Sequence, residues 1–539
     1  MIRSFMLTIA AILVAASVWP CTNLLVSRGA SADGSTYIGY TVDAHDFYGE
    51  IFHTPARVHG PGAVREIIEW DSGDRLGFIP QPERTYRVVG HVNEHQVSIG
   101  ETTFGGREEL YEGNGILDYG SLMFIALERA RTAREAIEVI TSLVAEYGWA
   151  SSGESLSIGD PDEVWILEII SKGKDDLGAV WVARRVPDGY VSAHANQARI
   201  RTFPLNDPET TLYSEDVIDF ARERGWYDGA DEDFSFADTY APLDFGALRF
   251  CEARVWSIFR RVAPSDEWPV SMIRGDVMDE PLPLWIKPDE PITTADAFAL
   301  LRDHYEGTEL DMTKDVGAGR FACPYRWRPM TWELDGMRYV HERAISTQQT
   351  GYSFIAQMRR DLPDAIGGIF WVGMDDSYST VYTPMYAGID AIPPSYGAAG
   401  GDMMTLSWDS AFWVFNWVAN QAYARYSDMI KEIQVVQGEL EGGFLARQPE
   451  VEAAALELYD RSPQLARDYL TEYSMTQGQA VVDRWRDLGA HLLVRYLDGN
   501  VKDTDGTPLH PRYPDAWYQR IVDERGDEIL IGPVEEDEE

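Results

Sequence analysis

An apolar leader ends immediately before Cys21 and sets where the folded part of this chain begins. Residues 1–4 include the basic Arg3, and residues 5–16 are largely apolar, an arrangement typical of a secretory signal. The apolar run is too short to span a bilayer. We therefore expect residues 1–20 to be a signal peptide or signal plus short propeptide, and the protein to be exported, either to the periplasm or into the medium.

Removal of the leader would make Cys21 the first residue, with a thiol and a free α-amine on the same residue. An α-amine titrates near pH ~8, so Cys21 could supply both nucleophile and base. The alternatives are a buried or disulfide-bonded cysteine and a lipidated cysteine. The flank Val18-Trp19-Pro20 is unsuited to lipoprotein processing and also to ordinary signal cleavage. A cut near residues 16–17 fits better and leaves a stub that self-cleavage would have to remove.

Composition limits the partners of this chain. Its 539 residues carry a net charge of -42, which disfavours nucleic acid and anionic lipid as partners, since both require a cationic surface. We read the carboxylates mainly as a solvated surface. Beyond the leader no stretch is apolar enough to cross a membrane. Apart from Cys21 the chain has Cys251 and Cys323, which either pair with each other or are separate buried thiols.

The first strands after Cys21 form a predicted β-hairpin. Residues 22–27 and 36–43 are strand-like, and Asp33-Gly34 supplies the turn between them. A hairpin centred near residues 32–33 places Cys21 opposite residues 43–45. Asp43 then lies near the amino terminus, where its carboxylate could orient the α-amine; the alternative is that Asp43 only ends a strand.

The remaining elements occur as blocks of strands and pairs of helices, which favours a layered α+β fold over alternating βαβ units. The predicted helices are residues 117–130, 132–147 (opened by a Thr132/Glu135 capping box), 249–261, 294–305 and most of 406–496. The predicted strands are residues 86–91, 96–101, 155–159, 164–170, 179–185, 190–194, 352–358, 368–374 and 380–386. Residues 206–238 are Asp-rich and are predicted to be a polar linker.

Several polar residues are candidates for a site. The sequence contains no zinc, P-loop, dinucleotide or G-x-S-x-G motif, so we expect no metal and no cofactor. Asn196 follows a predicted strand and could donate to an oxyanion, or cap a turn. Arg249 stands among apolar neighbours and could pair with a carboxylate in the site. Glu101, Thr102 and Thr103 end another strand and could contact substrate or bridge strands.

Seven segments together resemble the C69 dipeptidase family. They are residues 21–26 (CTNLLV), 32–36 (ADGST), 93–95 (NEH), 99–103 (IGETT), 131–136 (RTAREA), 193–200 (AHANQARI) and 410–429 (SAFWVFNWVANQAYARYSDM). The resemblance runs from Cys21 to about Tyr496. It implies a four-layer αββα sandwich of the N-terminal nucleophile hydrolases and cleavage of amide bonds, chiefly in dipeptides, by the terminal cysteine. We accordingly expect a catalytic domain at 21–400, a helical region packed on it at 401–500, and an acidic tail at 501–539.

One departure from the related choloylglycine hydrolases concerns the second strand. Those proteins place Arg-x-x-Asp there, whereas this chain has Tyr40-Thr41-Val42-Asp43, so the Asp is kept and the Arg is replaced. Tyr40 cannot supply a fixed positive charge. Stabilisation of the thiolate would then depend more on the α-amine of Cys21 or on Arg249, and Tyr40 becomes a candidate substrate contact.

The resulting expectation is an exported cysteine dipeptidase that acts on small peptides. A homo-oligomer is compatible with this expectation. Cys21 is the nucleophile, Asp43 orients its α-amine, Asn196 and a backbone N–H stabilise the oxyanion, and Arg249 and residues 101–103 hold the site or the substrate termini. Two alternatives stay open: an amidase of the choloylglycine hydrolase type acting on N-acyl substrates, and a non-catalytic envelope binding protein.

Overall fold

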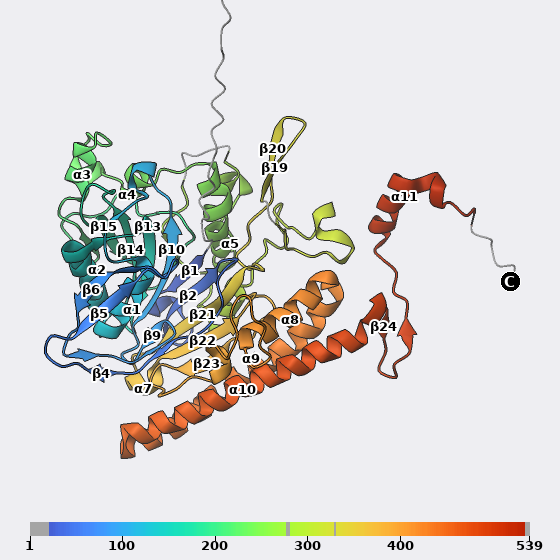
Figure 1. The fold of residues 1–539 in the computed structure, drawn as a ribbon. Coiled ribbons are helices and arrows are strands. Elements are labelled where there is room, and N and C mark those ends of the chain that lie inside the picture. The colour runs from blue at the N-terminus through green and yellow to red at the C-terminus, as the bar shows by residue number, and fades with distance from the viewer. Residues whose placement is uncertain (1–20, 276–280, 328–329, 534–539) are drawn as a thin grey trace, which may run out of the picture.

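The computed structural model describes residues 21–275, 281–327 and 330–533. The predicted signal peptide, residues 1–20, lies outside this part. The fold is α+β, as expected, and is built on two antiparallel sheets (Figure 1). Among the described helices, none combines the length and apolarity needed to cross a bilayer.

The first sheet has the order β18-β16-β1-β2-β21-β22-β23. Its strands are β1 (Thr22–Val26), β2 (Thr36–Asp43), β16 (Val191–His194), β18 (Trp285–Ile286), β21 (Thr350–Met358), β22 (Ile369–Met374) and β23 (Thr383–Tyr386). The predicted hairpin is β1–β2, in which Thr22 pairs with Thr41. Cys21 therefore comes level with Val42, one residue from the expected 43–45, and next to Asp43.

The second sheet has the order β17-β15-β14-β13-β10-β9-β8-β3. Its strands are β3 (His53–Thr54), β8 (Val88–Val89), β9 (Val92–Asn93), β10 (Ser98–Phe104), β13 (Gly153–Gly159), β14 (Val164–Ser171), β15 (Ala179–Arg185) and β17 (Thr211–Tyr213).

The prediction of a linker at 206–238 was wrong. This segment adds β17 to the sheet and continues into α3 (Val217–Glu223) and α4 (Phe236–Tyr240), because apolar residues such as Val217 and Phe220 are buried beneath its acidic exterior.

The side chains of β14 point alternately into two different hydrophobic cores, one on each face of the second sheet. Val164 and Ile166 belong to the core shared with the first sheet, whereas Trp165 and Leu167 belong to a separate core on the opposite face. That opposite face is covered by α1 (Tyr119–Arg129) and α2 (Ala133–Tyr147). Thr132 caps α2 by accepting a hydrogen bond from the Glu135 N–H, as the capping signal predicted.

The other sheet carries helices on its own outer side: α5 (Ala253–Val262) contacts β16, α6 (Thr294–Leu300) contacts β21, and α8 (Ala411–Ala424) contacts β22. The long α9 (Tyr426–Arg461) and α10 (Pro463–Arg495) run side by side beyond β23 (Figure 1). The remaining elements are β4 (Arg57–Val58), β5 (Val64–Ile68), β6 (Arg75–Pro80), β7 (Arg84–Thr85), β11 (Asn114–Gly115), β12 (Gly148–Trp149), β19 (Thr331–Leu334), β20 (Met337–Val340), α7 (Asp364–Gly367), β24 (Val501–Lys502), β25 (Pro508–Leu509) and α11 (Asp515–Ile529).

The three cysteines are all free thiols. Of the two expectations for Cys251 and Cys323, pairing is therefore excluded in this structure. Cys251 is buried within the π-helical turn that precedes α5, and Cys323 is half-buried in a loop.

Candidate active site

The Cys21 thiol lies between the two sheets, at the start of β1. The residue is only 2% exposed. Its Sγ atom is 3.7 Å from the Tyr40 hydroxyl on β2 and 3.7 Å from Glu101 Oε1 on β10. The Tyr40 hydroxyl also donates a hydrogen bond to the same Glu101 oxygen. Strands from both sheets thus meet at the sulfur, and they bring Cys21, Tyr40 and Glu101 together as a set.

The surroundings of the thiol disfavour its ionisation. Burial raises the pKa of Cys21 well above its ordinary value, and the nearby charges of Glu101 and Asp43 raise it further. Hydrogen bonds from the Asp43 backbone and from Tyr40 act in the opposite direction but are smaller. The thiol is therefore neutral at pH 7 in this structure, and a nucleophilic role requires a base or an additional positive charge beside it.

Asp43 is fully buried at the end of β2 and is held on several sides. Its carboxylate accepts hydrogen bonds from Thr41 (3.0 Å) and Thr350 (2.6 Å) and forms an ion pair with Arg343 at 3.1 Å. Burial raises the pKa of Asp43, while Arg343 and the hydrogen bonds lower it. These partners fix the orientation of the carboxylate close to the thiol. Arg343 was not identified from the sequence, because it lies 300 residues away.

The arginine that contacts the Cys21 backbone is Arg254. Its guanidinium donates to the Cys21 carbonyl oxygen at 2.5 Å and to Asn196 Oδ1 at 2.8 Å, and the residue is 1% exposed. Arg249 instead forms an ion pair with Glu342, next to Arg343. Arg249 lies in the π-helical turn before α5 and Arg254 in the first turn of α5, and of the two only Arg254 contacts the Cys21 backbone. Both stand among apolar neighbours, and the sequence offers no signal that separates them.

Asn196 follows β16 and is fixed by both ends of its side-chain amide. Its Oδ1 accepts from Arg254, and its Nδ2 donates to the Thr103 carbonyl oxygen at 2.7 Å. The backbone is left-handed, with φ of 60°, a conformation that Asn tolerates better than most residues. Arg254 therefore links Asn196 to the residue that carries the thiol.

Thr102 and Thr103 point to different partners. Thr102 Oγ1 lies 2.7 Å from His194 Nδ1, and His194 Nε2 lies 2.7 Å from Ser157 Oγ. Burial, with Arg199 and Arg254 nearby, lowers the pKa of His194 to about 3, so this ring is neutral and structural. Thr103 Oγ1 donates to Glu154 Oε1 at 2.8 Å and lines a cavity.

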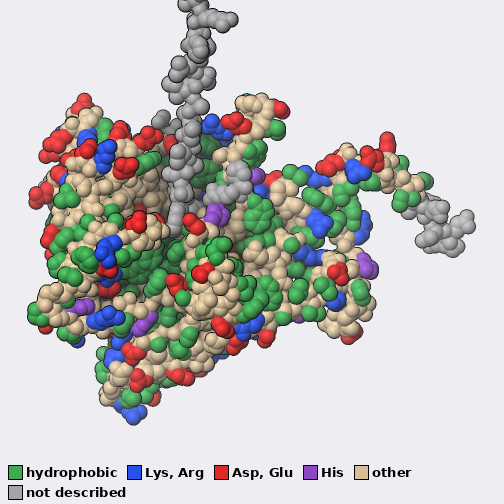
Figure 2. All heavy atoms as spheres, in the orientation of Figure 1, with side chains coloured by type: hydrophobic (Ala, Val, Ile, Leu, Met, Phe, Trp, Pro, Cys, Tyr) green, Lys and Arg blue, Asp and Glu red, His purple; other side chains and the backbone are tan. Residues whose placement is uncertain are grey.

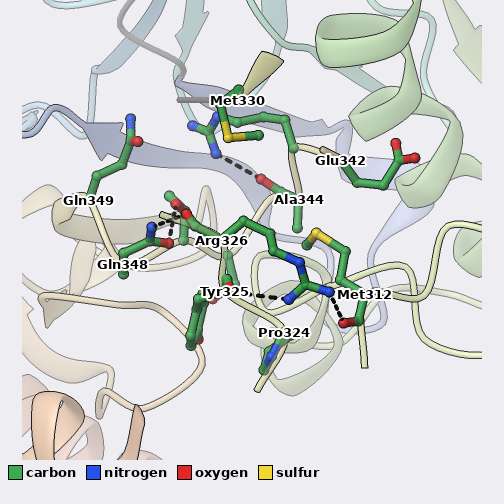
Figure 3. A pocket seen from close by; sticks show the side chains of 12 residues that line it. Met312, Pro324, Tyr325, Arg326, Met330, Glu342, Ala344, Gln348 and Gln349 are labelled. Carbon is green, nitrogen blue, oxygen red and sulfur yellow. Dashed lines mark hydrogen bonds between the residues drawn. The ribbon is translucent and has the colours of Figure 1, made fainter. Parts of the chain in front are cut away.

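Two cavities lie near these residues. The larger has a volume of about 540 Å³ and is lined by Thr103, Glu154 and Tyr119 among others. The smaller, of about 20 Å³, lies beside Arg343, and Arg326 reaches across it to the Met312 carbonyl (Figure 3). A volume this small holds no more than about one water molecule. Only the larger cavity can receive a peptide.

No metal centre is evident in the part of the chain that the structure describes. Within residues 21–275, 281–327 and 330–533, no three or more His, Cys, Asp or Glu side chains are grouped so as to hold an ion.

Comparison with known proteins finds one matching family model and several similar proteins. The family model described as peptidase family C69 matches residues 52–439, a region that begins after Cys21 and Asp43. The chain is 27% identical over 397 residues to a probable dipeptidase of Salmonella dublin, covering 69% of this chain and 82% of that protein. It is 25% identical to a probable dipeptidase of Latilactobacillus sakei (75% and 81% covered) and 23% identical to probable dipeptidase B of Streptococcus pyogenes serotype M1 (88% and 93% covered).

Proposed function

The chain belongs to peptidase family C69, and we propose that it is an exported dipeptidase that uses Cys21 as its nucleophile. The names of its relatives support hydrolysis of a peptide bond. The proposal requires cleavage between Pro20 and Cys21, so that the α-amine is free. We also assign the two packed sheets with helices on their outer sides to the N-terminal nucleophile hydrolase sandwich; the position of Cys21 at the start of β1, between the sheets, supports that assignment.

The Glu101 carboxylate, 3.7 Å from the Cys21 sulfur, is the observation that carries the proposal. In a dipeptide the α-ammonium is separated from the scissile carbonyl carbon only by the α-carbon. When that carbonyl lies against the thiol, the ammonium comes within reach of Glu101 and can form a charge-assisted hydrogen bond with it. An N-acylated substrate has no such charge and would leave a buried carboxylate without compensation. The geometry therefore favours a dipeptidase over an N-acyl amidase.

The reaction follows from the positions of the side chains. The α-amine of processed Cys21, oriented by Asp43, takes the thiol proton, and the sulfur attacks the peptide carbonyl. Asn196 Nδ2 and a backbone N–H stabilise the oxyanion, a contribution of ~10²–10³ in rate for one such donor. The α-ammonium returns the proton to the departing amine, and the C–N bond breaks to leave a thioester. Water then hydrolyses the thioester and regenerates the thiol.

Substrate binding also helps to activate the thiol. The charge of Glu101 is one of the causes that raise the pKa of Cys21. A substrate ammonium paired with Glu101 offsets that charge and so lowers the pKa of the thiol when a dipeptide is bound. The free enzyme keeps an unreactive thiol, and the correct substrate makes the thiolate more accessible.

The test compares Ala-Ala with N-acetyl-Ala-Ala, using protein whose amino terminus has been determined by mass spectrometry. We expect the mature chain to begin at Cys21 and to hydrolyse Ala-Ala. Preferential hydrolysis of N-acyl substrates would assign the amidase function instead. An active protein that retains a residue before Cys21 would contradict the mechanism, and a protein with no activity on any amide would favour a binding role.

A further inference from the structure

We propose that the cavity of about 540 Å³ beside the Cys21 site binds the cationic side chain of the substrate's first residue, so that dipeptides beginning with lysine or arginine are preferred. This inference rests on the proposed dipeptidase function and adds a specificity to it. Four carboxylates line the cavity, namely those of Asp46, Glu69, Asp71 and Glu154, and none of the described residues that line it is Lys, Arg or His.

The cavity begins where the thiol site ends. Thr103 lines it, and the carbonyl of Thr103 accepts the hydrogen bond from Asn196. Glu154 pairs with Thr103 in the β10–β13 ladder region and interacts with Glu101, which contacts the sulfur. A substrate held by Glu101 at its α-ammonium therefore has its first side chain beside this opening.

Glu154 marks the inner end of the cavity and lacks a full set of partners. The residue is 0% exposed, and its Oε1 accepts from Thr103. Its Oε2, like Oε2 of Glu101, receives no hydrogen bond from an N–H or O–H group of the described chain. Burial and the charge of Glu101 raise the pKa of Glu154 well above its ordinary value. Two adjacent buried carboxyl groups cannot both be ionised without a cation, so Glu154 keeps its proton, and a bound cation would take the place of that proton.

Asp46 and Asp71 lie toward the solvent end. The Tyr119 hydroxyl donates to Asp71 Oδ1 at 2.9 Å and orients that carboxylate. Partial burial raises the pKa of Asp71 to about 6, and the charges of Glu69 and Asp46 contribute to this. The carboxylates thus extend from a buried end at Glu154 to an exposed end at Asp46, which suits a long side chain with a terminal charge.

A solvated acidic surface is the competing explanation, since Asp and Glu side chains are spread over the face of the molecule seen in Figure 2. That explanation accounts for Asp46 and Asp71, which are exposed, but not for Glu154. A fully buried carboxyl group is not solvated, so Glu154 either keeps a proton beside Glu101 or is ionised by a cationic ligand.

The experiment compares Lys-Ala with norleucyl-alanine, whose first side chain has a similar length and no charge. For the mature wild-type protein we expect kcat/KM to be about tenfold or more higher for Lys-Ala, the value of one charge-assisted contact. Asp46→Asn and Asp71→Asn should each reduce this ratio. Asp487→Asn, on α10 far along the chain and exposed, is the matched control and should leave the ratio unchanged.

Each outcome has a distinct meaning. Equal kcat/KM for the two dipeptides, or a ratio that survives Asp46→Asn together with Asp71→Asn in a protein of unchanged melting temperature, overturns the inference while the dipeptidase function stands. Hydrolysis of neither dipeptide overturns the proposed function itself. If the preference for Lys-Ala is lost when a divalent cation is added to the assay, the cavity would be assigned to that ion instead.

Discussion

Replacement of Glu101 by glutamine should have opposite effects on catalysis and on thiol reactivity. Glu101 lies 3.7 Å from the Cys21 sulfur and is 3% exposed, so its charge acts on the thiol with little screening. Glu101→Gln keeps the size of the side chain and an oxygen for the Tyr40 hydroxyl, but it removes the negative charge. The variant therefore separates the effect of charge from the effect of packing.

Two magnitudes follow from this geometry. A hydrogen bond to a charged group contributes about 1.5–3 kcal/mol, so losing the contact to the substrate ammonium should lower kcat/KM for Ala-Ala by about 10- to 150-fold. Two unit charges 3.7 Å apart repel by about 1 kcal/mol in water and about 4.5 kcal/mol at an effective dielectric constant of 20. Removing that repulsion favours the thiolate, so the pKa of Cys21 should fall in the variant.

The assays are kcat/KM on Ala-Ala and the pH dependence of alkylation by iodoacetamide without substrate. We expect Glu101→Gln to lose peptidase activity and to be alkylated from a lower pH than wild type. Glu128→Gln is the matched control, since Glu128 is a buried carboxylate paired with Arg65 on a different face. Unchanged kcat/KM would refute the ammonium contact, and an alkylation profile that stays in place or moves upward would refute the electrostatic reasoning.

Three further predictions concern the residues around Cys21. Cys21→Ala should abolish hydrolysis with an unchanged urea midpoint, while Cys21→Ser should keep a residual rate because a hydroxyl can use the same amine; wild-type activity in Cys21→Ala would exclude the mechanism. Arg254→Met leaves buried acceptors on Cys21 and Asn196 unfilled and should lower the free energy of unfolding by about 3 kcal/mol, with a larger loss of kcat than Arg249→Met. The pKa of His194 is about 3 in the folded state against about 6.5 when unfolded, so its contribution is present above pH ~6.5 and is lost as the pH falls. The stability advantage of wild type over His194→Gln should therefore shrink by up to about 1.4 kcal/mol per pH unit below pH ~6.5, and a constant difference in urea unfolding between pH 4 and 8 would contradict this.

The elements predicted well are those fixed by local patterns. The hairpin arithmetic located Asp43 within one residue of its observed place, because strand pairing and turn length determine register. The strand at 179–185 was predicted with its observed bounds, since apolar residues and flanking turns mark it clearly. In the 206–238 segment the acidic exterior dominates the composition, and the few inward apolar residues, such as Phe220, are too sparse to reveal the strand and helices.

The residues that sequence analysis missed are those positioned by contacts between distant segments. Arg254 reaches Cys21 across 233 residues, and Arg343 reaches Asp43 across 300. Neither partner is marked by local spacing. Glu154 was also missed, because the predicted strand began at Ser155, whereas β13 begins at Gly153, and a polar residue at a strand end normally suggests the solvent face. Its burial only becomes evident when β10 and β13 are seen paired beside the thiol.

The distribution of charge at the site gives the strongest reason to regard it as incomplete without its reactants. Asp43 has Arg343 as a counterion, but Glu101 and Glu154 form no ion pair with a described Lys, Arg or His. Burial of the Cys21 thiol and the charges of Glu101 and Asp43 raise its pKa, which opposes catalysis. A site with this arrangement is useful only if positive charge is supplied from elsewhere. The free α-amine of a processed Cys21 and the α-ammonium of a dipeptide are two such charges, and both would arrive only when the enzyme is mature and its substrate is bound. In the proposed mechanism, the carboxylates that keep the thiol protonated in the unoccupied enzyme are therefore also the groups that select the substrate.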